Sequence, residues 1–320
     1  MAEVYSLHIG VEKYDTTFYT ATVNRLTGCL NDMEAMCALA RSHGVAEENA
    51  KFIPNPTRRI LLNELKGMQT KLSEGDIFFF TFSGHGWEKP DKDGDEIKNT
   101  SGRKGMDQTI CLSDRPVLDD ELNAIFRSYD KGVRIITLFD SCHSGSVHSF
   151  TLLSTDLHAR SASPSRLSKN HRNTISTEQR DTPPPVARGL TVDEVQAIYS
   201  RNLLFAVKSW VQSSLRSVGK IITSPDRRLS AVGISLAACE DDEKAYETTD
   251  RGKDNRGIFS LAFEMAIQEL SGSPTYEEIF QRSRDLLSQA DQHPTLSSFE
   301  TTEGTDTLKN FHQRESFLVL

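Results

Sequence analysis

Short apolar runs alternate with stretches of helical periodicity along the first half of the chain. Three apolar runs have the length and composition of buried strands: 4–10, 76–82 and 134–139. Three segments between them carry apolar residues at helical spacing: 30–42, 57–72 and 117–129. Thr57 is a predicted N-cap of the second segment, and the polar stretch 87–106 is predicted to be a loop. Strands that alternate with helices predict an α/β fold with a parallel sheet covered by helices.

The pattern changes near residue 150. Residues 158–185 are rich in Ser, Thr, Asn and Arg, include three consecutive prolines and contain almost no large apolar side chains, so they are predicted to form a mobile linker. The capping-box pattern from Thr191 to Glu194 opens an amphipathic segment, 191–218, which we expect either to pack on the domain or to act as a regulatory cover. The strand pattern resumes at 232–238, and helical spacing follows at 258–270 and 276–290.

Composition narrows the class of protein. The 320 residues are 37% hydrophobic and 26% charged, which is typical of a globular chain long enough for one large domain or two smaller ones. A net charge of −8 makes nucleic acid an improbable partner. The sequence has neither an apolar run that could span a bilayer nor a secretory signal, and its five widely spaced cysteines form no Cys-x-x-Cys pair. We therefore expect a cytoplasmic protein without membrane contact or structural zinc.

Two predicted strands run into reactive sequences. The strand that ends at Phe82 continues as Ser-Gly-His-Gly at 83–86, and the strand that ends at Phe139 continues as Asp-Ser-Cys-His-Ser-Gly at 140–145. Sites in parallel sheets form beyond the carboxyl ends of the strands, so both sequences should face one crevice. A Cys142 thiol activated by the His85 imidazole would be a nucleophile, and the nearby glycines would let backbone amides approach a developing oxyanion.

These residues allow three other interpretations. Cys142 could be a buried core cysteine and His85 a satisfied loop histidine, but their positions at equivalent strand ends argue against coincidence. A phosphatase-type cysteine needs an arginine six positions later, where this chain has His148. A metal site built from His85, Cys142, His143 and His148 lacks the short ligand spacing of structural zinc.

The sequence resembles the metacaspases, which belong to the caspase-like clan of cysteine peptidases. Blocks at 7–10, 26–32, 75–86, 118–122, 140–146 and 234–242 carry the resemblance over residues 4–150 and about 230–300. The type implied is a metacaspase without a prodomain or a prokaryotic orthocaspase. The implied fold is a caspase-like three-layer αβα sandwich with a mostly parallel central sheet. A large catalytic half (1–150), a linker (151–228) and a small half that completes the same sheet (229–320) are expected.

The resemblance assigns roles to individual residues. His85 and Cys142 would be the catalytic dyad, with the amides of Gly86 and Cys142 as oxyanion donors. Four further residues would line an acidic pocket that binds the substrate: Cys29, Asp32, Ser83 and Asp140. Carboxylates beside the nucleophile would select Arg or Lys and repel Asp.

No cofactor is expected to be required, but calcium is possible. Calcium-binding relatives carry aspartates at positions that match Asp107, Asp119, Asp120 and Ser149, and the serine departs from this pattern because it supplies no charge. We therefore expect weak calcium binding by Asp107, Asp119 and Asp120.

The sequence thus predicts a monomeric cysteine endopeptidase that cuts proteins or peptides after Arg or Lys and also cuts its own linker. The autocleavage candidates are basic residues: Arg160, Arg166, Lys169, Arg172, Arg180, Arg188, Lys220, Arg227 and Arg228. Two alternatives remain open, namely a catalytically silent scaffold that acts by binding and a peptidase of the same clan with another specificity.

Overall fold

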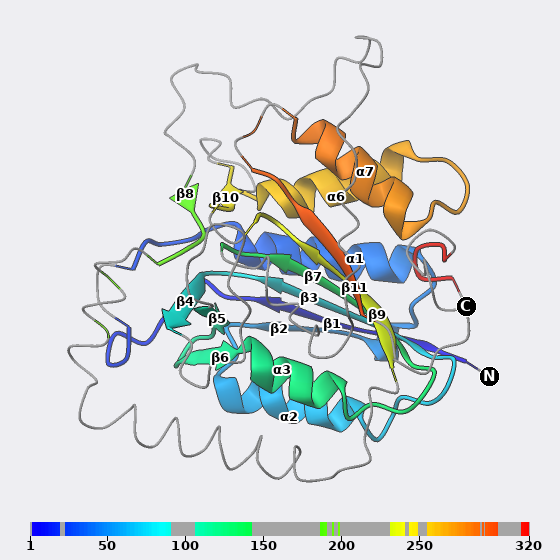
Figure 1. Cartoon of the computed structure of the whole chain (residues 1–320), viewed down its shortest axis with the longest axis horizontal. Coiled ribbons are helices and arrows are strands. Elements are labelled where there is room, and N and C mark those ends of the chain that lie inside the picture. The colour runs from blue at the N-terminus through cyan, green and yellow to red at the C-terminus, as the bar shows by residue number, and fades with distance from the viewer. Residues whose placement is uncertain are drawn as a thin grey trace.

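Figure 1 shows a computed structural model of the chain, which describes residues 2–19, 23–90, 106–142, 186–190, 194, 198, 231–240, 243–248, 255–288, 290, 292–299 and 315–319. The predicted linker at 158–185 lies outside these residues. Within the predicted helix at 191–218, Glu194 and Ile198 are helical, and the other positions lie outside the described residues.

A six-stranded sheet forms the centre of the molecule, with strand order β11-β9-β7-β3-β1-β2. Its strands are β1 (Val4–Gly10), β2 (Ala50–Pro54), β3 (Ile77–Ser83), β7 (Arg134–Asp140), β9 (Val232–Ala237) and β11 (Thr295–Phe299). All neighbours pair in parallel except β11, which is antiparallel to β9. The mostly parallel sheet predicted from the sequence is confirmed. Strands from beyond residue 230 continue the sheet that the first half of the chain begins.

Helices cover both faces of this sheet (Figure 1). One face carries α1 (Cys29–Ser42), α6 (Ile258–Glu269) and α7 (Tyr276–Leu286), and the other carries α2 (Arg58–Met68) and α3 (Asp119–Phe126). Alternate side chains of β3 join the two cores: Phe79 packs into the cluster with α1 and α6, whereas Phe78 and Phe80 pack into the cluster with α2 and α3. A strand buried on both faces is therefore nearly all apolar, and the three-layer sandwich is confirmed.

Several boundaries differ from the sequence prediction. The loop expected at 87–106 is wrong at its ends, because β4 (Gly86–Pro90) and β5 (Met106–Cys111) form a three-stranded antiparallel sheet with β6 (Pro116–Leu118). These strands are short, and polar residues interrupt the apolar positions of β4 and β5, so hydrophobic periodicity does not reveal them. The helix predicted from 117 starts only at Asp119 because β6 pairs with β5. The helix predicted over 57–72 ends at Met68, but its N-cap is confirmed, since the Thr57 side chain accepts the Ile60 amide.

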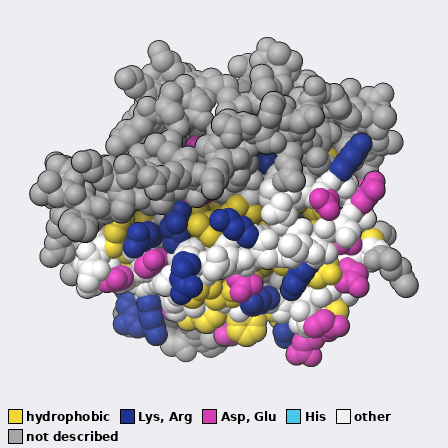
Figure 2. All heavy atoms as spheres, turned by 90° about the horizontal axis from the view of Figure 1, so that it is seen from below, with side chains coloured by type: hydrophobic (Ala, Val, Ile, Leu, Met, Phe, Trp, Pro, Cys, Tyr) yellow, Lys and Arg dark blue, Asp and Glu magenta, His cyan; other side chains and the backbone are white. Residues whose placement is uncertain are grey.

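Three minor elements complete the described chain. The turn η1 (Glu47–Asn49) precedes β2, and β8 (Val186–Ala187) pairs with β10 (Tyr246–Glu247) in a two-stranded ribbon. On the face formed by α2 and α3, basic and acidic side chains are interspersed with apolar ones (Figure 2). Among the described helices, none has both the length and the apolar character that crossing a membrane requires.

Candidate active site

The ends of β3 and β7 bring the two predicted reactive sequences together. These strands pair in parallel, and Ser83 lies opposite Asp140. His85 comes two residues after Ser83, and Cys142 comes two residues after Asp140, so both follow the same position in the register. Both side chains are completely buried. This register places the two reactive sequences side by side at one edge of the sheet, as expected for neighbouring parallel strands.

The His85 ring has a fixed tautomer. Its Nε2 lies 2.7 Å from the carbonyl oxygen of Asn24, and because a carbonyl only accepts, Nε2 carries the proton. Nδ1 is buried and has no hydrogen-bond partner among the residues that the structure describes. Burial lowers the pKa of the His85 imidazole to about 4, so the ring is neutral and Nδ1 has a free lone pair. Such an imidazole can accept a proton.

The Cys142 thiol is held by the backbone of Ala245. Sγ accepts the Ala245 amide at 3.1 Å and lies 3.4 Å from the Ala245 carbonyl oxygen, to which S–H can donate. Burial raises the pKa of this thiol to about 12, which keeps it protonated at neutral pH. Among the described contacts, no hydrogen bond joins Sγ to the His85 ring. Burial of both groups therefore favours a neutral thiol and a neutral imidazole.

Two backbone amides converge on one carbonyl oxygen beside the thiol. The amides of Gly86 and Cys142 donate to the carbonyl oxygen of Arg188 at 3.0 and 3.1 Å. Gly86 must be a glycine here, because a Cβ at this position would lie 1.9 Å from the Cys142 carbonyl oxygen. Paired N–H groups of this kind stabilise the oxyanion that forms during acyl transfer.

Arg188 belongs to an extended segment that crosses the site. Before Arg188, β8 pairs antiparallel with β10. The Arg188 amide donates to the carbonyl oxygen of Ala245 at 2.8 Å. After it, the Leu190 amide donates to the carbonyl oxygen of Gly86 at 3.3 Å. The chain thus binds residues 186–190 by strand addition, the way in which many proteins bind an extended peptide.

The Arg188 guanidinium fills a buried acidic pocket. Nη2 lies 2.7 Å from Asp32 Oδ2, and Nη1 donates to Ser83 Oγ at 2.6 Å. Asp140 Oδ1 lies 3.4 Å from Nη1, and Glu247 Oε2 lies 3.6 Å from Nη2. The three polar residues that the sequence assigned to the pocket, Asp32, Ser83 and Asp140, therefore meet at one guanidinium. The fourth, Cys29, is buried beside Ser83, and burial raises its thiol pKa.

Comparisons with known proteins agree with this geometry. Residues 6–151 match the model of the metacaspase peptidase C14 domain. Metacaspase-1 of Schizosaccharomyces pombe is 33% identical over 141 residues, which cover 40% of this chain and 32% of that protein. Metacaspase-1 of Mycosarcoma maydis is 25% identical over 88% of this chain and 68% of its own length. Over residues 6–151, the chain is similar to metacaspases.

The fold has a structural counterpart as well. A crystal structure of a protein from Geobacter sulfurreducens covers 99% of this chain with a TM-score of 0.66 at 21% identity. This likeness concerns the fold alone. The chain spans about a third of the Schizosaccharomyces pombe metacaspase that it matches, so the activity of a whole metacaspase is not carried over from the comparison.

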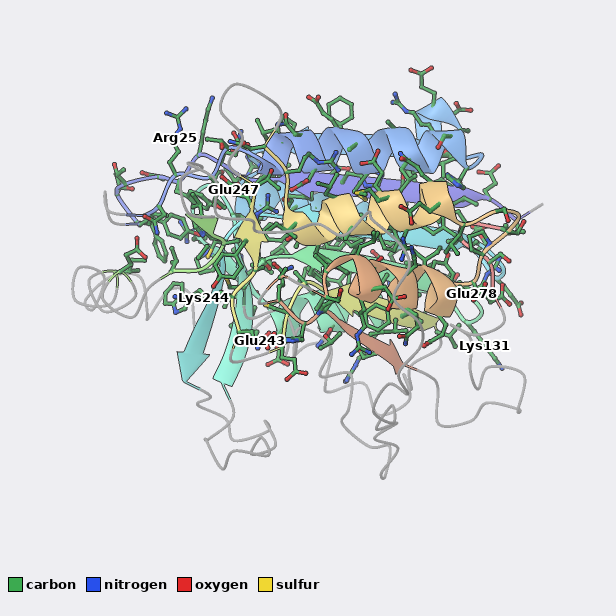
Figure 3. The ribbon with its side chains drawn as sticks, turned by 90° about the horizontal axis from the view of Figure 1, so that it is seen from above. Arg25, Lys131, Glu243, Lys244, Glu247 and Glu278 are labelled. Carbon is green, nitrogen blue, oxygen red and sulfur yellow. The ribbon has the colours of Figure 1, made fainter. Side chains whose placement is uncertain are left out.

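Three further residues of the pocket were not predicted from the sequence. Glu247 accepts the amides of Thr27 and Gly28, both at 3.1 Å, and lies at the end of the molecule where α1 and α6 begin (Figure 3). Arg256 Nε donates to Asp32 Oδ1 at 2.7 Å. Gly257 leaves room for the guanidinium, because a Cβ there would lie 2.5 Å from Arg188 Nη1. Nothing in the spacing of the sequence links these residues to Asp32, which lies more than 200 positions earlier.

Helix N-termini support the buried carboxylates. The amide of Ser260, in the first turn of α6, donates to Asp140 Oδ2 at 2.8 Å, and the Gly257 amide donates to Asp32. The positive end of a helix dipole favours negative charge at these positions. Burial nevertheless raises the pKa of the Asp140 carboxyl, with Arg188 acting in the opposite direction. The pocket therefore depends on a cation to balance its charge.

The remaining predicted site residues fall outside this pocket. Asp119 and Asp120 begin α3, whereas the Asp107 side chain and Ser149 lie outside the described residues. The described residues contain no group of three or more potential metal ligands, so the calcium site stays a prediction. Of the autocleavage candidates, only Arg188 is described. The others lie outside the described residues: Arg160, Arg166, Lys169, Arg172, Arg180, Lys220, Arg227 and Arg228.

Proposed function

We propose that this chain is a cysteine endopeptidase that cuts after Arg, and less efficiently after Lys, through Cys142 and His85. The observation that carries the proposal is the position of Arg188, whose side chain fills an acidic pocket while its carbonyl oxygen accepts two amides beside the thiol. This combination is what acyl transfer requires of a bound substrate. The substrates would be proteins or peptides with a basic residue at the cut site.

The chemistry follows from the tautomer of His85. Nδ1 takes the proton from Sγ as the thiolate forms a bond to the carbonyl carbon, and the carbonyl electrons move to the oxygen held by Gly86 and Cys142. The C–N bond then breaks as His85 gives its proton to the leaving amine, which leaves a thioester on Cys142. A water molecule transfers a proton to Nδ1 as its oxygen bonds to the carbonyl carbon. The C–S bond then breaks as Nδ1 returns this proton to Sγ, which restores the thiol and releases the carboxylic acid product.

The charge of the pocket supports the specificity. Asp32, Asp140 and Glu247 are each at most 1% exposed, and they surround the Arg188 guanidinium with hydrogen-bond and ion-pair partners. A planar guanidinium can bind several such groups at once, whereas an ammonium offers a point charge. Lysine should therefore be accepted less well, and an aspartate should be excluded by repulsion.

The same observation supports self-cleavage at the Arg188–Gly189 bond. While the segment is bound, it covers the thiol, and the protein cannot admit another substrate at this site. We therefore propose that cutting this bond precedes activity on other proteins. The two products should remain together, since β9 pairs with β7 along six registered positions of one sheet.

Hydrolysis of three matched peptides tests the function. The peptides differ only in having Arg, Lys or Asp before the cut bond, and the protein is first incubated until its own cleavage stops. We expect rapid cleavage after Arg, slower cleavage after Lys and none after Asp. The matched control is Cys142→Ala, which should cut none of them. Absence of cleavage by wild type would favour the silent scaffold, and efficient cleavage after Asp would contradict the pocket assignment.

A further inference from the structure

The chain beyond the Arg188–Gly189 bond enters a second, apolar environment. Leu190, two residues after Arg188, is only 7% exposed. It packs in a cluster with Tyr19, Trp87, Cys111 and Ile198. We call Tyr19, Trp87 and Cys111 the apolar wall. These three residues come from parts of the chain that precede the bound segment.

The apolar wall is attached to the catalytic residues. Trp87 follows Gly86, whose amide binds the Arg188 carbonyl oxygen, and the Cys111 amide donates to the carbonyl oxygen of His85 at 2.9 Å. Tyr19 packs edge-on against Tyr14, whose ring lies 5.3 Å from that of His85. The wall is therefore held in a fixed position relative to the bond between Arg188 and Gly189.

The backbone fixes which residue of a substrate would reach the wall. Gly189 lies alongside Gly86 in a parallel bridge, and the Leu190 amide donates to the Gly86 carbonyl oxygen at 3.3 Å. Because these contacts involve main-chain atoms only, any peptide bound in the same way would place its second residue after the cut at the wall. The wall offers apolar and aromatic side chains to that residue.

We propose that the apolar wall is a specificity subsite for the second residue after the cut, and that it selects a branched aliphatic side chain such as leucine. The proposal rests on the proposed function, because it names a further part of the substrate for the same reaction. Burying a leucine side chain is favourable, whereas a charged residue at this place would lose its hydration among apolar and aromatic side chains. Selection by this enzyme would then depend on both sides of the cut.

Ile198 shows how the uncut chain uses the same surface. It is helical, 1% exposed and part of the cluster, so Leu190 and Ile198 both contribute apolar side chains here. A peptide substrate supplied in solution has only the residue equivalent to Leu190. The test must therefore separate binding of substrate from docking of the chain's own segment.

The decisive experiment uses peptides that keep Arg before the cut and Gly after it, and that vary only the next residue among Leu, Ala, Asp and Lys. With wild-type protein that has completed self-cleavage, we expect kcat/KM for Leu to exceed that for Ala by about ten- to a hundredfold, and Asp and Lys to be worse than Ala. Equal rates within about twofold for Leu, Ala, Asp and Lys would overturn the proposal. Failure to cut any of the four would instead contradict the proposed function.

A parallel measurement on the chain itself distinguishes a subsite from a docking contact. Self-cleavage of Leu190→Ala and Leu190→Ile is followed in the full chain, and we expect a slowing of about tenfold or more for Ala and little change for Ile. If Leu190→Ala slows self-cleavage while the peptides show no preference, the wall docks the linker only and the proposal is wrong. Trp87→Ala should reduce the Leu-to-Ala ratio of the peptides, and an unchanged ratio would also contradict it.

Discussion

The two sides of the Arg188–Gly189 bond are held by different physical interactions. On one side, a guanidinium that is completely buried meets Asp32, Asp140 and Glu247, so binding depends on charge and on hydrogen-bond geometry. On the other side, Leu190 packs against apolar and aromatic side chains and has one main-chain hydrogen bond. Buried charges that lose a partner are strongly penalised, whereas apolar contacts are lost in proportion to area. Loss of a contact in the acidic pocket should therefore remove nearly all cleavage. Loss of contacts at the apolar wall should lower the rate in proportion to the apolar area that is lost.

Removing a carboxylate from the acidic pocket should have the largest effect on specificity. Asp32→Asn keeps the shape of the side chain but removes the charge that binds Arg188 and Arg256. We expect kcat/KM for an Arg peptide to fall by roughly a hundred- to five-thousandfold, which corresponds to about 3–5 kcal/mol of transition-state stabilisation. The control is Asp285→Asn on the exposed side of α7, which should leave the rate unchanged. A similar loss in both variants, or none in Asp32→Asn, would show that the pocket charge is not used.

Alkylation of Cys142 measures how firmly each side holds the segment. With Cys142 buried, its pKa of about 12 leaves almost no thiolate at neutral pH, and labelling by iodoacetamide should be slow. In a His85→Ala background, which prevents self-cleavage, Arg188→Asp should release the segment by repulsion and speed labelling by about a hundredfold. Leu190→Asp should speed it less, because the Arg188 contacts remain. Equal labelling in all three chains, read by mass spectrometry at Cys142, would contradict this comparison.

A methyl group placed in the acidic pocket should weaken binding by an intermediate amount. In Gly257→Ala, the added Cβ would lie 2.0 Å from Asp140 Oδ2 and 2.5 Å from Arg188 Nη1, so both groups must move. Overpacking of this kind costs about 1–3 kcal/mol, which predicts a loss of roughly five- to a hundredfold in kcat/KM for Arg peptides. Gly67→Ala in α2 is the matched control, because its Cβ would meet nothing within 4 Å. A rate for Gly257→Ala that equals the control would show that the pocket has spare room.

The sequence revealed the acidic pocket better than the apolar wall. The strand ends at His85 and Cys142 were predictable because buried strands have a strong apolar pattern and parallel strands end at one edge of the sheet. Asp32, Ser83 and Asp140 followed from the resemblance to metacaspases. Arg188 was one of nine basic candidates, and nothing in its local sequence distinguishes it, because the choice depends on which residue reaches the pocket in three dimensions.

The apolar wall was not predictable for a related reason. Trp87 and Cys111 lie on β4 and β5, short strands within or next to a stretch expected to be a loop, and Tyr19 lies in an irregular segment before α1. Glu247 and Gly257 likewise reach the acidic pocket only because β9 and α6 pack beside β7 and α1. Contacts between segments so distant in sequence leave no periodic signal along the chain.

Mapping of new chain ends tests cleavage between Arg188 and Gly189 most directly. Wild type and Cys142→Ala are incubated under the same conditions, and their fragments are analysed by mass spectrometry and terminal sequencing. We expect one early fragment pair in wild type, ending at Arg188 and beginning at Gly189, and an intact Cys142→Ala chain. First cleavage at another basic residue, or equal cleavage in Cys142→Ala, would contradict it.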